Sequence, residues 1–336
     1  MHRSGTSAVT QLLALAGAEL PQNVMPGDEH NAKGYFEPWK IALFNDQRLR
    51  AGGSAWDDVF ALPYAPLADP DEADWTARAF TLYRDEFGEA RFPLLKDPRV
   101  SVLAPMWRAV LAAADMPARV VIPVRSPLAV AGSLARRDGF PVEKSVLLWC
   151  VYMLAAEANS RDLPRAFVSF DDLIVDWRAQ VTHIEAAHGA PLPRISSHAE
   201  AAIDSFLTSD LRHNAGLGDL AGVPTVGPMA KAVYDWFAAA AAGPAPPLAP
   251  LEAAAAQIAE LKARIGAFVS PAACALDTAR ADLAEERQDR KRDALFIHEL
   301  EIELALMRRE KVEIEAERLR EFAQIEARID AMLATR

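Results

Sequence analysis

The chain has 336 residues, of which 51% are hydrophobic and 25% are charged, and its net charge is −11. This length suits a catalytic domain with an appendage, and the composition is that of a globular protein with a sizeable core. The negative surface as a whole repels nucleic acid and anionic lipid. Any anion-binding site must therefore be a local cluster of cations and backbone N–H groups.

Cysteine usage and hydropathy exclude further classes of protein. The two cysteines, Cys150 and Cys274, lie far apart in the sequence, which excludes a disulfide framework and a Cys-rich zinc site. No apolar stretch approaches the length of a membrane span, and the N-terminus has no charged-then-apolar signal region. We expect a cytoplasmic protein with both thiols reduced.

The first two thirds of the chain have a mixed α/β pattern. Residues 8–16 predict a buried helix, and 142–161 predict a longer one. Three short apolar runs, at 92–96, 119–124 and 166–170, are typical of buried parallel strands. Strands that alternate with helices predict a parallel sheet with covered faces.

The composition changes abruptly near residue 238. We predict a catalytic domain at 1–236, an Ala/Pro linker at 237–250 and a helical tail at 251–336. In the tail, apolar residues follow the spacing of a coiled coil, which Lys311 and Arg318 interrupt. The residues on this spacing are Ile297, Leu300, Leu304, Met307 and Ile314 and, after a phase shift, Phe322, Ile325, Ile329 and Met332. A single amphipathic helix lying on the catalytic domain is the alternative.

A phosphate-binding loop is predicted at the start of the chain. Arg3, Ser4, Gly5, Thr6 and Ser7 lead directly into the first helix, whose N-terminal N–H groups and dipole attract anions. Gly5 allows a close approach of the backbone, and the hydroxyls and the guanidinium add donors. A helix with an ordinary Ser/Thr cap is the alternative. The absence of a lysine after Gly5 argues against a Mg-dependent ATPase or kinase.

A second anion clamp is predicted after the strand at 119–124. Arg125 follows this strand, and Ser133 lies eight residues on, in a helix that Pro127 can open. In open α/β sheets ligands bind at the carboxyl ends of the strands, where these two side chains can converge on one anion. The alternative is an arginine that braces the edge of the sheet.

The string His-Arg-Ser-Gly-Thr-Ser at 2–7 resembles the phosphosulfate loop of sulfotransferases that use 3′-phosphoadenosine-5′-phosphosulfate (PAPS), in their bacterial and carbohydrate branches. The resemblance covers about residues 1–215 and implies a three-layer P-loop-like sheet. It assigns the phosphosulfate to the loop at 3–7, with Arg3 neutralising the bridging oxygen. It assigns the 3′-phosphate to Arg125 and Ser133, and it requires no metal. The family has a central strand before this loop, whereas only Met1 precedes His2 here, so we expect a sheet without that strand.

The same resemblance identifies candidate catalytic residues. The string Gly-Tyr-Phe-Glu at 34–37 is similar to one in bacterial relatives, which makes Glu37 the expected base. His30 and then His2 are the other candidates for this role. Lys96, in a Lys-Asp-Pro string like that of protein-tyrosine sulfotransferases, is the expected cation for the transition state. A surface salt bridge of Glu37 and a structural ion pair of Lys96 are the alternatives.

Together these features predict transfer of a sulfuryl group from PAPS to an acceptor hydroxyl, on a carbohydrate or a glycolipid by resemblance to that branch. The alternative is a non-catalytic sulfotransferase-like scaffold that oligomerises through its coiled coil. In either case we expect residues 251–336 to tether the chain to a second copy or to another partner.

Overall fold

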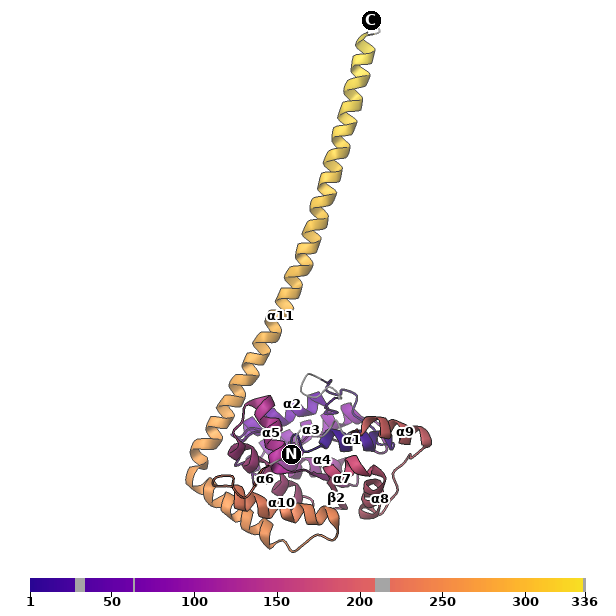
Figure 1. Cartoon of the computed structure of the whole chain (residues 1–336). Helices are drawn as coiled ribbons and strands as arrows, with labels where there is room; N and C mark the ends of the chain where they lie inside the picture. Colours follow the sequence, from indigo (N-terminus) through magenta and orange to yellow (C-terminus); the bar gives the residue numbers. More distant parts are fainter. Residues whose placement is uncertain (28–33, 63, 209–217, 335–336) are drawn as a thin grey trace. The chain divides into compact units, whose positions relative to one another are not determined.

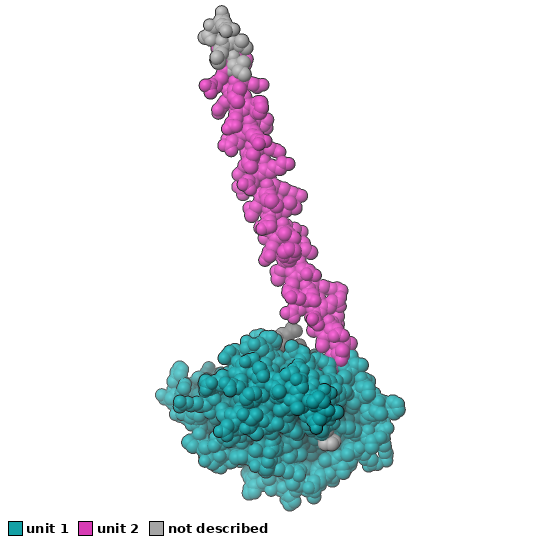
Figure 2. Space-filling view, turned by 180° about the vertical axis from the view of Figure 1, so that it is seen from behind, with its two compact units in different colours: residues 1–275 teal, residues 276–336 magenta. Residues whose placement is uncertain are grey.

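The structure of the protein is a computed structural model that describes residues 1–27, 34–62, 64–208 and 218–334. The chain divides into two compact units, Met1–Ala275 and Leu276–Arg336 (Figure 2). The first unit has mixed α/β structure and the second is helical. The described part of the chain is therefore α/β in class and mostly helical.

A parallel pair of strands lies in the first unit. Strand β1 (Val120–Val124) pairs in register with β2 (Arg165–Ser169), from Val120 opposite Arg165 to Val124 opposite Ser169. The connection between them passes through α5 (Pro127–Asp138) and α6 (Val142–Ala158), as a parallel pair requires. The predictions of strands at 119–124 and 166–170 and of a helix at 142–161 are confirmed.

The prediction of a strand at 92–96 is wrong. This segment is extended, but its pairing is limited to one bridge between Pro93 and Glu19. The Glu19 N–H donates to the Phe92 carbonyl, and the Leu94 N–H donates to the Glu19 carbonyl, each over 2.8 Å. A single partner residue supports one pair of hydrogen bonds, which does not extend into a ladder.

Helices account for most of the chain, and Figure 1 shows their arrangement around the strands of the first unit. Side-chain caps begin three of them: Ser169, Asp176 and Ser196 each accept a hydrogen bond from the backbone N–H three residues on. Besides α5 and α6, the helices are α1 (Thr6–Leu15), α2 (Trp39–Ala51), α3 (Asp71–Phe87), α4 (Val100–Ala113), α7 (Phe170–Val175), α8 (Trp177–His188), α9 (Ser197–Phe206), α10 (Gly227–Ala242) and α11 (Ala249–Ala334).

Helices cover both faces of the two strands. Alternate residues of β2 belong to different clusters of the core: Phe167 packs with α6 and α10, whereas Ala166 and Val168 pack with α1 and α8. This alternation follows from the two-residue period of a strand. Helix α6 is apolar on all sides and is almost entirely buried, as is typical of a helix inside a core.

The structure differs from the predicted linker at 237–250. Helix α10 continues to Ala242, and α11 begins at Ala249. The Trp236 indole N–H lies 3.2 and 3.1 Å from the carbonyls of Pro246 and Pro247, which holds the short connection against α10. Leu251 and Ile258 of α11 are buried in the core of the first unit. The alanines that suggested a linker are strong helix formers, and here they extend helices.

The predicted helical tail is confirmed as a helix, since α11 runs unbroken to Ala334 with Pro271 inside it. Its first part packs on the first unit, where Ser270 Oγ lies 3.1 Å from Asp58 Oδ1. In the second unit the apolar side chains on the coiled-coil spacing are 44 to 69% exposed wherever they are described. Coiled-coil pairing stays a prediction.

None of the helices that the structure describes is by itself both long and apolar enough to cross a bilayer. Helices α5 and α6 meet the length and composition criterion only as a pair, with a bend of 117° between them.

Candidate functional site

The loop before α1 has the geometry of an anion cradle. Two of its residues, Arg3 (φ 62°) and Gly5 (φ 85°), adopt positive φ, so successive backbone N–H groups turn toward the start of the helix. No side chain caps the N-terminus at Gly5, which leaves the first turn of α1 for a ligand. A Cβ atom at position 5 would collide with the ring of Phe170. Glycine is therefore required there both by φ and by space.

The two predicted anion clamps meet at this loop, although they lie more than 120 residues apart. Arg3 Nε donates to Ser133 Oγ over 2.7 Å, and an Arg125 Nη donates to the Arg3 carbonyl over 3.0 Å. The Arg125 guanidinium also lies 4.4 Å from the centre of the Phe170 ring. Arg125 is positioned by the end of β1 and Ser133 by α5, so the connection after β1 delivers both groups to the loop.

The electrostatics of this cluster favour an added anion. Burial lowers the pKa of Arg125 to about 10, against the influence of Asp171, and the neighbouring Arg3 and Arg136 lower it further. Burial also lowers the pKa of Arg3, with Arg137 the next contributor. Burial is the leading cause of both shifts, so a phosphate or sulfate bound in this partly buried site would stabilise the charged forms of Arg3 and Arg125.

Two buried polar atoms of the loop have no hydrogen-bond partner among the described residues. They are Ser4 Oγ and His2 Nε2, and both side chains are buried. A buried polar group without a partner is costly, so such groups mark places where a ligand or water belongs. Both atoms belong to the segment whose backbone forms the cradle.

A buried ion pair lies next to the loop. Lys96 Nζ donates to Glu37 Oε1 over 2.5 Å and to the Tyr35 carbonyl over 2.8 Å. The Ser7 hydroxyl donates to the same Tyr35 carbonyl over 3.2 Å. One carbonyl oxygen thus links the loop before α1 to the Lys96–Glu37 pair. Burial lowers the pKa of Lys96, although Glu37 opposes this shift.

A second cation, Arg99, holds this pair in a network of carboxylates. Its guanidinium contacts Asp97 at 2.9 Å, Asp46 at 2.5 Å and Glu37 at 3.9 Å. Burial alone would lower the pKa of Arg99, but Asp97, Asp46 and Glu37 outweigh burial and raise it. The carboxylates therefore compensate this arginine fully.

Sequence reasoning missed part of this network. Asn45 Nδ2 donates to Asp97 Oδ2 over 2.6 Å, and the Trp107 indole N–H donates to Asn45 Oδ1 over 2.9 Å. Asp46 completes the set from the next position of α2. A signal did exist in the sequence: Asn45 lies four residues from both Ile41 and Leu49, which puts an amide on the buried face of a helix.

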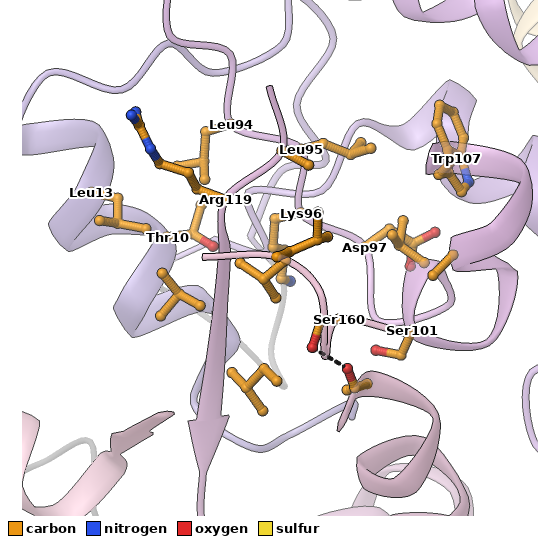
Figure 3. Close-up of a pocket in the computed structure, with 18 of the residues that line it drawn as sticks. Thr10, Leu13, Leu94, Leu95, Lys96, Asp97, Ser101, Trp107, Arg119 and Ser160 are labelled. Carbon is orange, nitrogen blue, oxygen red and sulfur yellow. Dashed lines mark hydrogen bonds between the residues drawn. The ribbon is translucent and has the colours of Figure 1, made fainter. Parts of the chain in front are cut away.

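A cavity of about 350 Å³ borders the network. It lies between α1, the extended segment 92–97, β1 and the end of α6, and its lining is mostly apolar. Figure 3 shows Thr10 and Leu13 of α1, Leu94 and Lys96 of the extended segment, and Ser160 around it. The cavity therefore connects the ion pair with the edge of β1.

The structure thus brings together Arg3, Ser7, Arg125 and Ser133 at the loop, with Glu37 and Lys96 beside them. Thr6 forms the first turn of α1, where its carbonyl accepts a hydrogen bond from the Thr10 hydroxyl over 2.8 Å. The alternative base His30 lies outside the described residues.

His2, the remaining candidate for the base, is packed between aromatic rings. Its ring centre lies 4.8 Å from that of Trp56 and 5.9 Å from that of Tyr152. Burial, followed by Arg99 and Arg137, lowers the pKa of His2 well below its usual value, so the ring stays neutral.

Among the described residues, no group of three or more His, Cys, Asp or Glu side chains is arranged so that it could hold a metal ion. Comparisons of the chain with protein-family models, with curated proteins and with solved structures find no match. Any statement about function therefore depends on the geometry of the site itself.

Proposed function

We propose that this chain is a sulfotransferase that moves the sulfuryl group of PAPS to an acceptor hydroxyl, on a carbohydrate or a glycolipid. The observation that carries the proposal is the meeting of two anion clamps, through the Arg3–Ser133 and Arg125–Arg3 hydrogen bonds, beside the Glu37–Lys96 pair. A donor with two separate anionic groups needs two such clamps close to a base and a cation.

The residues present fit the donor. The backbone of residues 3–7 and the start of α1 would hold the phosphosulfate, where the unpartnered Ser4 hydroxyl provides a further donor. Arg125 and Ser133 would hold the 3′-phosphate. Arg3 lies between the two clamps, since its side chain reaches Ser133 while its carbonyl accepts from Arg125. The guanidinium of Arg3 therefore neutralises charge between the two anionic groups.

The neighbouring ion pair provides the acid–base chemistry. PAPS supplies the sulfuryl group and its phosphate leaving group. Glu37 accepts the proton of the acceptor hydroxyl, and Lys96 stabilises the negative charge that develops at the loop. The Tyr35 carbonyl accepts hydrogen bonds from both Ser7 and Lys96, and so links Lys96 to the loop. Asp46 and Asp97 fix Arg99, and Arg99 in turn orients Glu37. The position of these charges is set by folding, before substrates bind.

We include in this proposal the three-layer P-loop-like sheet that the resemblance implies. The cavity next to Met1 is bordered by β1 and by the extended segment 92–97, and its lining is mostly apolar. An extended apolar strand in this cavity would complete a parallel sheet with helices on both faces. Fusion of a five-residue segment of mostly Val and Ile ahead of Met1 should therefore bury apolar surface in the cavity. The free energy of unfolding should rise by about 2 kcal/mol or more. A Ser/Gly-rich extension of equal length is the control, and equal stability of the two fusions would remove the strand from the proposal.

Calorimetric titration with 3′-phosphoadenosine-5′-phosphate tests the proposed function. We expect saturable binding by the wild type and binding weakened about 30-fold or more by Arg125→Ala, since loss of one partner of a buried charge pair costs roughly 2–5 kcal/mol. Arg119→Ala, which removes an exposed arginine at the other end of β1, is the matched control and should bind normally. Failure of the wild type to bind would reject the sulfotransferase in favour of the scaffold.

A further inference from the structure

The second unit presents an apolar seam with charged residues inside it. Helix α11 continues unbroken through 276–334, so the seam has no second helix of its own chain within this unit. With Leu276 as a first core position, core positions recur at spacings of three and four residues. The apolar members of this register are 44 to 58% exposed: Leu276, Leu283, Ile297, Leu300, Leu304, Met307, Ile314 and Ile325.

Charged side chains occupy other core positions of the same register. They are Glu286, Arg290, Asp293, Lys311, Arg318, Glu321 and Arg328. In a parallel, in-register pair of helices, each of these residues would lie opposite the same residue of the second copy. Like charges that face each other in a coiled-coil core destabilise the pairing, so this orientation is disfavoured.

An antiparallel pair of identical helices avoids every one of these repulsions when it is centred on Ile302. In that register Lys311 faces Asp293 of the second copy, and Arg318 faces Glu286. The layers nearest the centre are apolar, with Leu304 opposite Leu300 and Ile297 opposite Met307. Each layer occurs twice by symmetry, so the two opposite-charge layers give four ion pairs.

The remaining layers set a charged residue against an apolar one or pair two apolar residues of unequal size. Arg290 faces Ile314, Glu321 faces Leu283 and Arg328 faces Leu276, whereas Ile325 faces Ala279. Within its own helix Arg290 already contacts Glu286 over 2.6 Å, and Lys311 lies 3.8 Å from Glu315. Both contacts are solvent-exposed and weak, so they can rearrange when the seam is covered.

We propose that residues 276–334 form an antiparallel coiled coil with a second copy of this chain, centred on Ile302. The partner is identified by charge complementarity: the cations in the C-terminal half of the seam match the anions in its N-terminal half.

Sedimentation equilibrium of the full chain tests this proposal through a charge swap. The wild type should be a dimer, and Lys311→Glu and Asp293→Lys should each weaken dimerisation about 10- to 30-fold, because each sets like charges together twice. The double variant should restore the wild-type affinity. In a parallel, in-register pair each single variant would exchange one like-charge pair for another and keep the wild-type affinity. In an antiparallel register shifted by one heptad, the double variant would not recover.

The other outcomes overturn the proposal. A monomeric wild type would leave the seam to a different chain, and a trimer or tetramer would reject the two-stranded pairing. Circular dichroism of each variant shows whether the helix is retained, so loss of dimer with loss of helix is distinguished from loss of the charge match. None of these results depends on the proposed sulfotransferase activity, because the altered residues lie outside the first unit.

Discussion

Two partly buried arginines of the first unit stand in different electrostatic environments. Arg99 faces three carboxylates, which raise its pKa above the usual value although burial opposes them. Burial lowers the pKa of Arg125 to about 10, and Arg3 and Arg136 add to this shift while Asp171 opposes it. The difference separates two roles. A compensated cation fixes its neighbours in place, whereas a partly buried cation whose pKa is lowered would be stabilised by an added anion.

The largest expected effect concerns the carboxylate of Glu37, which pairs with Lys96 and contacts Arg99. Glu37→Gln keeps the size of the side chain but removes the base, so we expect turnover to fall about 10²- to 10⁴-fold. Release of 3′-phosphoadenosine-5′-phosphate in the presence of a saccharide acceptor measures it. Binding of that product should change less than about 3-fold, because Glu37 is not in the anion clamps.

The matched control is Glu86→Gln, which neutralises a buried carboxylate in α3 whose oxygens accept hydrogen bonds from Asn23. It should keep its turnover even where it costs stability. Equal losses of turnover in the two variants would mean that Glu37 acts only through the fold.

The next prediction compares the effects of replacing Arg99 and Arg125 on the stability of the protein. Arg99→Met leaves Asp97, Asp46 and Glu37 without their shared cation, so the unfolding free energy should drop by about 3–5 kcal/mol. Arg125→Met removes a partly buried cation whose charged form burial disfavours, and its stability should stay within about 1 kcal/mol of the wild type. Urea denaturation measures both. A larger loss in Arg125→Met than in Arg99→Met would invert the comparison.

A smaller effect depends on pH and on His2, which lies close to arginines of both regions. Burial, then Arg99 and Arg137, lower the pKa of His2 well below its usual value. The unfolded chain takes up a proton here near pH 6.5 while the folded chain does not, so stability that is complete above pH 6.5 is lost as the pH falls.

The slope from this one group is at most ~1.4 kcal/mol per pH unit. His2→Phe keeps a ring against Trp56 and cannot take up the proton, so it should reduce the slope between pH 6.5 and 5.5. Urea titrations at pH 7.5, 6.5 and 5.5 measure the contribution. An unchanged slope would show that the folded protein accommodates a charged His2.

The loop at residues 3–7 and the network around Arg99 also differ in how far they could be predicted from the sequence. The strands at 119–124 and 166–170 were predictable because their short, mostly apolar runs can be recognised without knowing which strand they pair with. Arg3, Arg125 and Ser133 could be placed by local motif and by the end of a strand. The segment 92–96 has the same composition as a strand, but Glu19 is its only bridge partner among the described residues. Pairing depends on neighbours distant in the sequence, which composition does not specify.

The network around Arg99 was less predictable than the loop at residues 3–7, because it depends on contacts between segments that are distant in the sequence. Asp46 and Asn45 reach Arg99 and Asp97 only because α2 packs against this part of the chain. Neither residue belongs to a short motif. The loop, by contrast, is one continuous segment of five residues, and its chemistry can be inferred from their order.

The central claim is that Arg125 belongs to a site prepared for a specific anionic group. The most direct test titrates wild type and Arg125→Met with two ligands, adenosine 5′-phosphate and its 3′-phosphorylated form. In the wild type the 3′-phosphate should tighten binding about 30-fold or more, and in Arg125→Met by less than about 3-fold. A variant that keeps the full preference for the 3′-phosphate, or a wild type that shows none, would contradict this account.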